Sequence, residues 1–113
     1  MGVGLRSYGL KGDRNQMKPS ILLSKNRDRV LSVIQQYNIV NPRIIGSVAR
    51  GDDTDNSDLD LLVSIIPEKT TLVDLYGIVD DLEELLGIHV DIITESSIPP
   101  EQRAVILKEA ISV

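Results

Sequence analysis

Apolar residues in the first half of the chain recur at helical spacing and then give way to a short strand-like run. Four of them fall at i, i+3, i+4 and i+7, which predicts one face of a helix with Ser24 as its N-cap. These helical positions are Val30, Val33, Ile34 and Tyr37. Asn41-Pro42 ends the pattern, and residues 43–45 predict a short strand that leads into Gly46.

The second half of the chain repeats this alternation of strand and helix. Residues 58–66 form an apolar run typical of a strand that Pro67 stops, and Thr70 or Thr71 is expected to cap the next helix. The apolar stripe of that helix is Leu72, Leu75, Val79, Leu82 and Leu86. Gly87 is expected to end it, and residues 88–94 are the third expected strand. A final helix starts at Pro99-Pro100, with apolar candidates Ala104, Ile106, Leu107 and Ile111.

The resulting order α-β-α-β-α-β-α predicts an α/β (α+β) domain in which a small mixed three-stranded sheet packs against helices. Residues 17–113 are long enough for one such domain and too short for two. Residues 1–16 combine glycines with polar and basic residues, without a clear period, so we expect them to form a flexible N-terminal tail.

Composition and charge exclude several classes of function. The chain has no Trp, Phe or Cys, which argues against a base-stacking platform, a disulfide framework and a thiolate zinc site. No apolar run is long enough to span a membrane, and no signal-peptide pattern is present, so a cytoplasmic protein is expected. Residues 52–95 carry thirteen acidic residues against one lysine. This acidic segment argues against nucleic acid as a partner and suits divalent cations or a basic protein, although many of the charges fit a solvated helix face.

The chemistry-bearing residues begin at a glycine turn. Gly46-Ser47 opens a possible short helical turn over 47–50, and backbone N–H groups in such a turn can face an anion. Ten residues then separate Ser47 from Asp58, and Asp58 and Asp60 stand on one face of the expected strand. Two adjacent carboxylates need a cation. Together they predict a site for a metal–triphosphate complex.

Asp91 adds a third carboxylate in the otherwise apolar strand 88–94. If this strand lies beside the Asp58–Asp60 strand, the three carboxylates form a two-metal site for phosphoryl transfer, with Mg²⁺ as the expected ion and Mn²⁺ as a substitute. Asp91 is the candidate base for the attacking hydroxyl. The main alternative makes Asp91 a buried ion-pair partner of Arg43 or Arg50.

Polar residues near the glycine turn and the carboxylates are candidate nucleotide contacts or structural residues. Ser47 and the backbone around it are expected to hold the β- and γ-phosphates of a nucleotide, and Arg50 either adds a cation there or pairs with Asp52 or Asp58. His89 could share the face of Asp91, but a structural role is the simpler interpretation. Tyr76, on the acidic helix, is expected to pack.

Gly46-Ser47, Ala49-Arg50-Gly51, Ser57 and the Asp58-x-Asp60 pair, followed by the later strand Asp91, resemble the DNA polymerase β-type nucleotidyltransferase superfamily. The likeness covers about residues 20–110 and points to the minimal nucleotidyltransferase family. The resemblance implies the nucleotidyltransferase fold, catalysis by Asp58, Asp60 and Asp91, and nucleotide contacts at Gly46, Ser47, Arg50 and Ser57.

The resemblance also implies a biological role. Similar small proteins are antitoxins that transfer AMP from ATP to a tyrosine of a helical HEPN-type toxin. Two alternatives stay open: an antitoxin that acts chiefly by complex formation, and a small-molecule nucleotidyltransferase of the antibiotic-modifying type, for which the chain shows no second domain.

Overall fold

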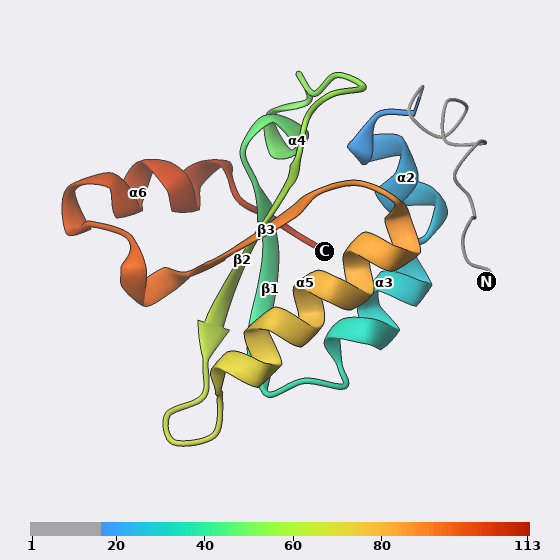
Figure 1. Cartoon of the computed structure of the whole chain (residues 1–113). Coiled ribbons are helices and arrows are strands. Elements are labelled where there is room, and N and C mark those ends of the chain that lie inside the picture. Colours follow the sequence, from blue (N-terminus) through green and yellow to red (C-terminus); the bar gives the residue numbers. More distant parts are fainter. Residues whose placement is uncertain (1–16) are drawn as a thin grey trace.

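Four strands form one mixed sheet in the computed structural model, which describes residues 17–113 (Figure 1). The predicted N-terminal tail lies outside the described residues. The elements, in order, are α2 (Pro19–Lys25), α3 (Arg27–Ile34), β1 (Ile39–Ile45), α4 (Ser47–Arg50), β2 (Leu59–Ile65), α5 (Leu72–Leu86), β3 (Val90–Thr94), the 3₁₀ turn η1 (Glu95–Ser97), α6 (Pro100–Glu109) and β4 (Ile111–Ser112).

The sheet has the strand order β3-β2-β1-β4. β1 is antiparallel to β2 and to β4, whereas β2 and β3 are parallel and are joined by the crossover helix α5. The predicted mixed α/β architecture is confirmed, but the expected count of three strands is wrong. Ile111 lies in the two-residue strand β4 and not in the last helix, because Ala110 leaves the helical conformation with a ψ of 140°. A strand of two residues is too short to show a period in the sequence.

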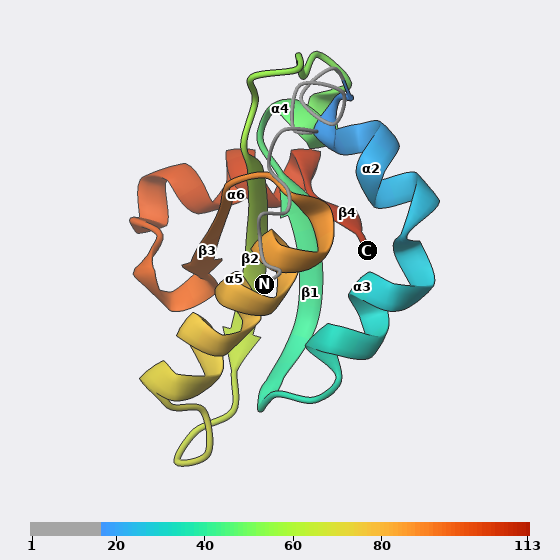
Figure 2. The same ribbon diagram turned by 45° about the vertical axis from the view of Figure 1, so that its right-hand side comes forward.

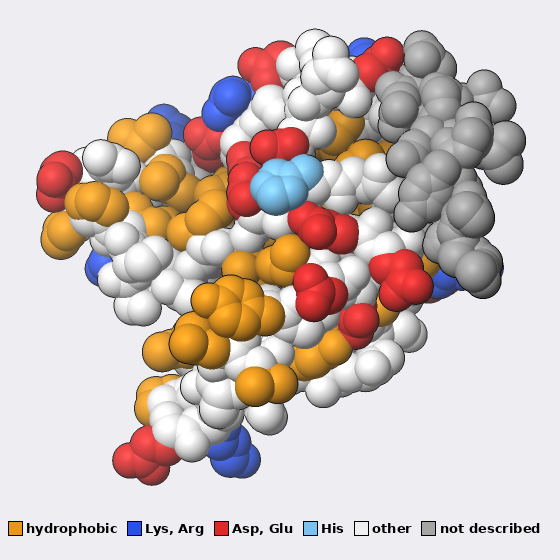
Figure 3. All heavy atoms as spheres, in the orientation of Figure 1, with side chains coloured by type: hydrophobic (Ala, Val, Ile, Leu, Met, Phe, Trp, Pro, Cys, Tyr) orange, Lys and Arg blue, Asp and Glu red, His pale blue; other side chains and the backbone are white. Residues whose placement is uncertain are grey.

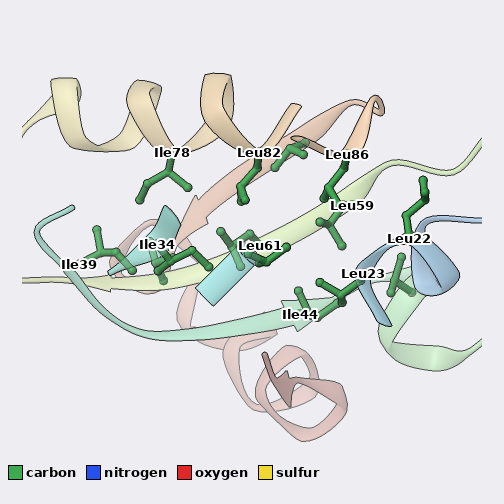
Figure 4. Close-up of a cluster of buried hydrophobic side chains, with 14 residues drawn as sticks. Leu22, Leu23, Ile34, Ile39, Ile44, Leu59, Leu61, Ile78, Leu82 and Leu86 are labelled. Carbon is green, nitrogen blue, oxygen red and sulfur yellow. The ribbon is translucent and has the colours of Figure 1, made fainter. Parts of the chain in front are cut away.

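Alternation along β2 gives the sheet two different apolar faces. Leu59, Leu61 and Val63 belong to the larger core, which α2, α3 and α5 cover (Figures 2 and 4). Leu62 points the other way, into a smaller cluster with Ile45 and Ile98 that α6 covers. Asp60 and Ser64 share this second face with Leu62, because residues two apart in a strand point the same way. The predicted acidic site therefore lies on the α6 side of the sheet.

The N-terminal helical pattern contains two helices and not one. Ser24, the predicted N-cap, lies inside α2, and the break comes at Asn26, whose backbone N–H bonds to Leu22 and Leu23. The first strand also begins earlier than predicted. β1 continues through Asn41-Pro42 because the register of its pairing with β2 shifts between Val40 and Arg43, which accommodates the proline as an irregularity.

Helix α5 starts and ends as the sequence predicted. Thr71 and Asp74 form a reciprocal capping box at its start, and Gly87 ends it. The buried face is Ile78, Leu82 and Leu86, and Leu75 packs against the same core. Leu72 was wrongly placed in the predicted stripe, because it is exposed. Tyr76 is also 64% exposed, since it lies two residues from Ile78 and so on another side of the helix. Within the described residues no helix has the length and apolar character needed to cross a bilayer.

Candidate active site

The glycine turn between β1 and α4 is built against a carboxylate. Gly46 has φ 79° and ψ −153°, a backbone conformation that is almost confined to glycine. A Cβ atom at this position would overlap the Oδ2 atom of Asp60. The turn after β1 therefore lies so close to the Asp60 side chain that only glycine fits at position 46. The predicted short helix follows at once, as α4.

Strand register places two of the predicted carboxylates side by side. Asp60 pairs with Ile45 on one side and with Asp91 on the other, so the end of β1, Asp60 and Asp91 form one row across the sheet. Asp58 precedes β2, and ligand atoms of Asp58, His89 and Asp91 lie within 4.8 Å of one another. The structure thus brings together all three of the predicted acidic residues next to the Gly46 turn.

The electrostatics of this cluster favour a bound cation. Partial burial raises the pKa of Asp60, and the neighbouring carboxylates of Asp91 and Asp58 raise it further, while Arg50 opposes this effect. Closely spaced oxygen ligands with unbalanced negative charge are the donor set that Mg²⁺ or Mn²⁺ prefers. Asp58, Asp60 and Asp91 therefore fit a hard divalent ion chemically.

The interpretation of Asp91 as a buried ion-pair partner of Arg43 or Arg50 is wrong. Arg43 pairs with Glu95, at 3.0 Å between Nη2 and Oε1, on another part of the sheet. Arg50 pairs with Glu109 at 3.0 Å and with Asp52 at 3.4 Å. Asp91 itself has a side chain that is 49% exposed, because β3 lies at the edge of the sheet. Within residues 17–113 no arginine pairs with this carboxylate.

His89 belongs to the cluster, although the sequence offered it mainly as a structural residue. Its Nε2 atom lies 3.0 Å from Oδ1 of Asp91, and its Nδ1 atom lies 3.0 Å from Oε2 of Glu83. The Asp91 carboxylate above all raises the pKa of His89, and Asp58 and Glu83 add to this effect. Figure 3 shows the acidic side chains gathered around this histidine. The i, i+2 spacing of His89 and Asp91, which places both on one face of a strand, was the sequence signal that His89 belongs to the cluster.

Arg50 and Ser57, two of the predicted nucleotide contacts, are each bonded to other parts of the chain. Arg50 stands on α4 beside Asp60 but is engaged by Glu109 of α6, a residue that the sequence analysis did not connect with it. The hydroxyl of Ser57 accepts a hydrogen bond from the backbone N–H of Thr54 at 2.8 Å, so it shapes the loop between α4 and β2. Asp53, which the sequence analysis also missed, is buried in this loop and accepts a hydrogen bond from the N–H of Ser20. These bonds fix the loop that delivers Asp58.

Comparisons with known proteins agree with this geometry. The family model described as nucleotidyltransferase domain matches residues 27–113. A Methanocaldococcus jannaschii protein that is provisionally named protein adenylyltransferase MJ0435 is 33% identical over 91 residues, which are 80% of this chain and 97% of the relative. Protein adenylyltransferase MntA of Thermococcus cleftensis is 29% identical over 79 residues, 70% of this chain and 79% of the relative.

Solved structures give the same result. One that is provisionally described as a minimal nucleotidyltransferase superposes with a TM-score of 0.74 at 40% identity, covering 83% of this chain and 95% of the other. A toxin–antitoxin crystal structure with AMP-PNP has a TM-score of 0.62 at 18% identity, over 77% and 71% of the two chains, which is a likeness of fold. This chain therefore belongs to the minimal nucleotidyltransferases of the nucleotidyltransferase domain family, as the residues from Gly46 to Asp60 predicted.

Proposed function

We propose that this chain is a Mg²⁺-dependent protein adenylyltransferase that transfers AMP from ATP to a tyrosine hydroxyl of a HEPN-type toxin and so acts as its antitoxin. The observation that carries the proposal is the row formed by the Gly46 turn, Asp60 and Asp91, with Asp58 beside it. A phosphate-facing turn next to three carboxylates suits transfer of a nucleotidyl group.

The proposed reaction assigns one task to each part of the site. The hydroxyl oxygen of the acceptor attacks the α-phosphorus of ATP, the bond from that phosphorus to the pyrophosphate oxygen breaks, and pyrophosphate leaves. Asp91, which is exposed at the sheet edge, takes the hydroxyl proton. Ser47 and the Gly46–Ser47 backbone hold the departing phosphates. Mg²⁺ held by Asp58, Asp60 and Asp91 would neutralise phosphate charge and lower the pKa of the hydroxyl, and Mn²⁺ can substitute.

A protein acceptor is supported by the relatives and by the surface. The Methanocaldococcus jannaschii and Thermococcus cleftensis relatives carry the name protein adenylyltransferase, and the fold occurs in a toxin–antitoxin complex. The surface around the site is strongly acidic, which suits a basic protein as the acceptor (Figure 3).

A second candidate function is inhibition of the toxin by complex formation alone. The exposed apolar residues Leu72, Val73 and Tyr76 at the start of α5 favour it, because large exposed hydrophobic side chains mark contact surfaces.

Intact-mass spectrometry of a HEPN-type toxin incubated with this chain, ATP and Mg²⁺ separates these functions. The toxin is expected to gain one or more AMP masses, and the double variant Asp58→Asn, Asp60→Asn is expected to add none. The matched control is Asp80→Asn with Glu84→Gln, which removes two exposed carboxylates of α5 and should leave transfer unchanged. Absence of any transfer by the wild type would sink the enzymatic proposal. Full neutralisation of toxin activity by the Asp58, Asp60 double variant would favour complex formation.

A further inference from the structure

Strand β3 has a free edge immediately beside the site. It is the last strand of the sheet order, and its only neighbour in the described residues is β2. The carbonyl of His89 accepts a hydrogen bond from Leu59 of β2, whereas the N–H of Val90 donates to Oε2 of Glu83 and so points the other way. Because backbone groups alternate along a strand, the N–H and C=O of Ile92 also point away from β2.

Side chains close the two ends of this edge and leave its middle open. At one end the Val90 N–H donates a hydrogen bond to Oε2 of Glu83, at 2.9 Å between N and O. At the other end the Ser97 hydroxyl donates to the Thr94 carbonyl at 2.8 Å. Within residues 17–113 no hydrogen bond reaches the Ile92 N–H or C=O, and none reaches the outward Val90 C=O or Thr94 N–H. The open stretch is therefore as long as one short added strand and is centred on Ile92.

The register of the sheet determines where an added strand would place its side chains. Ile45, Asp60 and Asp91 are already cross-strand neighbours in one row. A residue added opposite Asp91 would extend this row by one position, and its side chain would share the face of Asp91. A tyrosine there is longer than aspartate, so its hydroxyl would lie on the face of the sheet that carries the carboxylates.

The surroundings of the edge indicate the chemistry of its occupant. Figure 3 shows acidic side chains at the site end and hydrophobic side chains over α5 and α6 on either side. The exposed apolar residues of these helices include Leu72, Val73 and Tyr76 of α5 and Val105 of α6. An extended segment that combines basic and apolar residues complements both features.

We infer that the acceptor protein presents its tyrosine on an extended segment that adds to β3 as an antiparallel strand, with the tyrosine opposite Asp91. This inference rests on the proposed function, because it places the hydroxyl whose oxygen attacks the α-phosphorus while pyrophosphate leaves and Asp91 takes the proton. In this register the residue opposite Ile92 exchanges two backbone hydrogen bonds with it, and the tyrosine N–H points away from β3.

Backbone N-methylation of a peptide substrate tests the strand pairing. The probe is a nine-residue peptide of alternating lysine and valine with one central tyrosine, supplied with ATP and Mg²⁺ and followed by mass spectrometry. It is expected to accept AMP. N-methylation of the two residues that flank the tyrosine should lower kcat/KM by about tenfold or more, the factor for one or two lost hydrogen bonds. N-methylation of the tyrosine itself, the matched control, should have little effect.

Each other outcome of the peptide assay has a defined meaning. Loss of transfer only on methylation of the tyrosine would overturn the antiparallel orientation and indicate parallel strand addition. Equal transfer to all three peptides, or equal loss from both methylated ones, would overturn the inference. Transfer to the HEPN-type toxin without any transfer to the unmodified peptide would also overturn it and leave the proposed function standing. Transfer to neither would count against the proposed function itself.

A variant of the edge gives an independent test with the toxin as acceptor. Ile92→Pro removes the outward N–H, and proline is tolerated at an edge position whose N–H faces solvent. Ile92→Ala removes similar apolar contact but keeps the N–H, so it is the matched control. Ile92→Pro should lower AMP transfer about tenfold relative to Ile92→Ala while both bind AMP-PNP equally. Equal transfer by the two variants would contradict strand addition. A wild-type dimer that Ile92→Pro converts to a monomer with unchanged transfer would show a second copy at this edge instead.

Discussion

Substitution of Gly46 by alanine separates the geometry of the site from the stability of the fold. The backbone conformation of Gly46, with its positive φ, would reduce the stability of the fold by about 1–3 kcal/mol if the residue carried a side chain. For a domain of this size that corresponds to a fall in Tm of about 4–20 °C. The new Cβ would also overlap Oδ2 of Asp60, which has to move by about 1 Å to reach ordinary van der Waals contact. A displacement of that size at a reacting centre lowers the rate by about 100-fold.

Gly51 provides the matched control for this experiment. It also has a positive φ, 81°, but a Cβ there would meet nothing within 4 Å. Gly51→Ala should therefore also lower Tm, because a left-handed backbone costs a residue with a side chain about 1–2 kcal/mol. It should leave the position of Asp60 unchanged. The assays are thermal unfolding and single-turnover AMP transfer, measured at a temperature where both variants are folded. Equal transfer rates in Gly46→Ala and Gly51→Ala would refute the claim that the turn positions Asp60.

A double variant isolates the steric part of the effect. In the Gly46→Ala background, Asp60→Ala removes the overlapping carboxylate and should recover part of the lost Tm. If the stability costs of the two substitutions are simply additive, the contact between the turn and Asp60 is not the cause.

Three further substitutions give predictions of definite sign. Gly77→Ala, which usually stabilises a helix, should destabilise this protein by about 1–3 kcal/mol, because the new Cβ would lie 2.6 Å from Cε1 of Tyr37; a rise in Tm would contradict this. Asp60→Asn should abolish AMP transfer yet raise the Tm of the protein in EDTA at pH 7. Burial and neighbouring carboxylates raise the pKa of Asp60, so its negative charge destabilises the folded state. An unchanged or lower Tm would argue against this electrostatic cost. Hydrogen bonds from Arg43 and then Ser64 lower the pKa of Glu95, so its contribution to stability is present at neutral pH and lost as the pH falls below about 4.5. The Tm difference between wild type and Glu95→Gln should therefore shrink in acid, and a difference that is the same at pH 3 as at pH 7 would exclude this linkage.

Local patterns were enough to predict the centre of the fold and the candidate site. The alternation of β2 and the heptad-like spacing of α5 depend on residues close in sequence, so the sequence shows them directly. Asp91 was identifiable because a carboxylate in an apolar strand is energetically costly unless it is paired or binds a cation. Its convergence with Asp60 was conditional on the two strands being neighbours, and the parallel pairing of β2 with β3 meets that condition.

The features that the sequence did not predict depend on contacts between distant residues. Arg50 pairs with Glu109, which is 59 positions away, and nothing near Arg50 in the sequence indicates α6 as its neighbour. β4 exists only because Ile111–Ser112 meets Arg43–Ile44 across the sheet. The edge position of β3, which exposes Asp91, depends likewise on the strand order and not on the composition of the strand itself.

The alternation of β2 has a consequence for how the sequence of this protein can change. One strand supplies both Leu61 to the larger core and Asp60 to the acidic row, so a one-residue insertion within β2 would exchange the two sets. Such a change would bury a carboxylate under α5 and expose a leucine, and the chain would lose its chemistry and its fold together. An insertion in the loop 51–57 would instead keep the alternation of β2 and disturb the hydrogen bonds of Asp53 and Ser57 that position Asp58. A change of length in that loop therefore threatens the chemistry, whereas a change within the strand threatens the chemistry and the fold together.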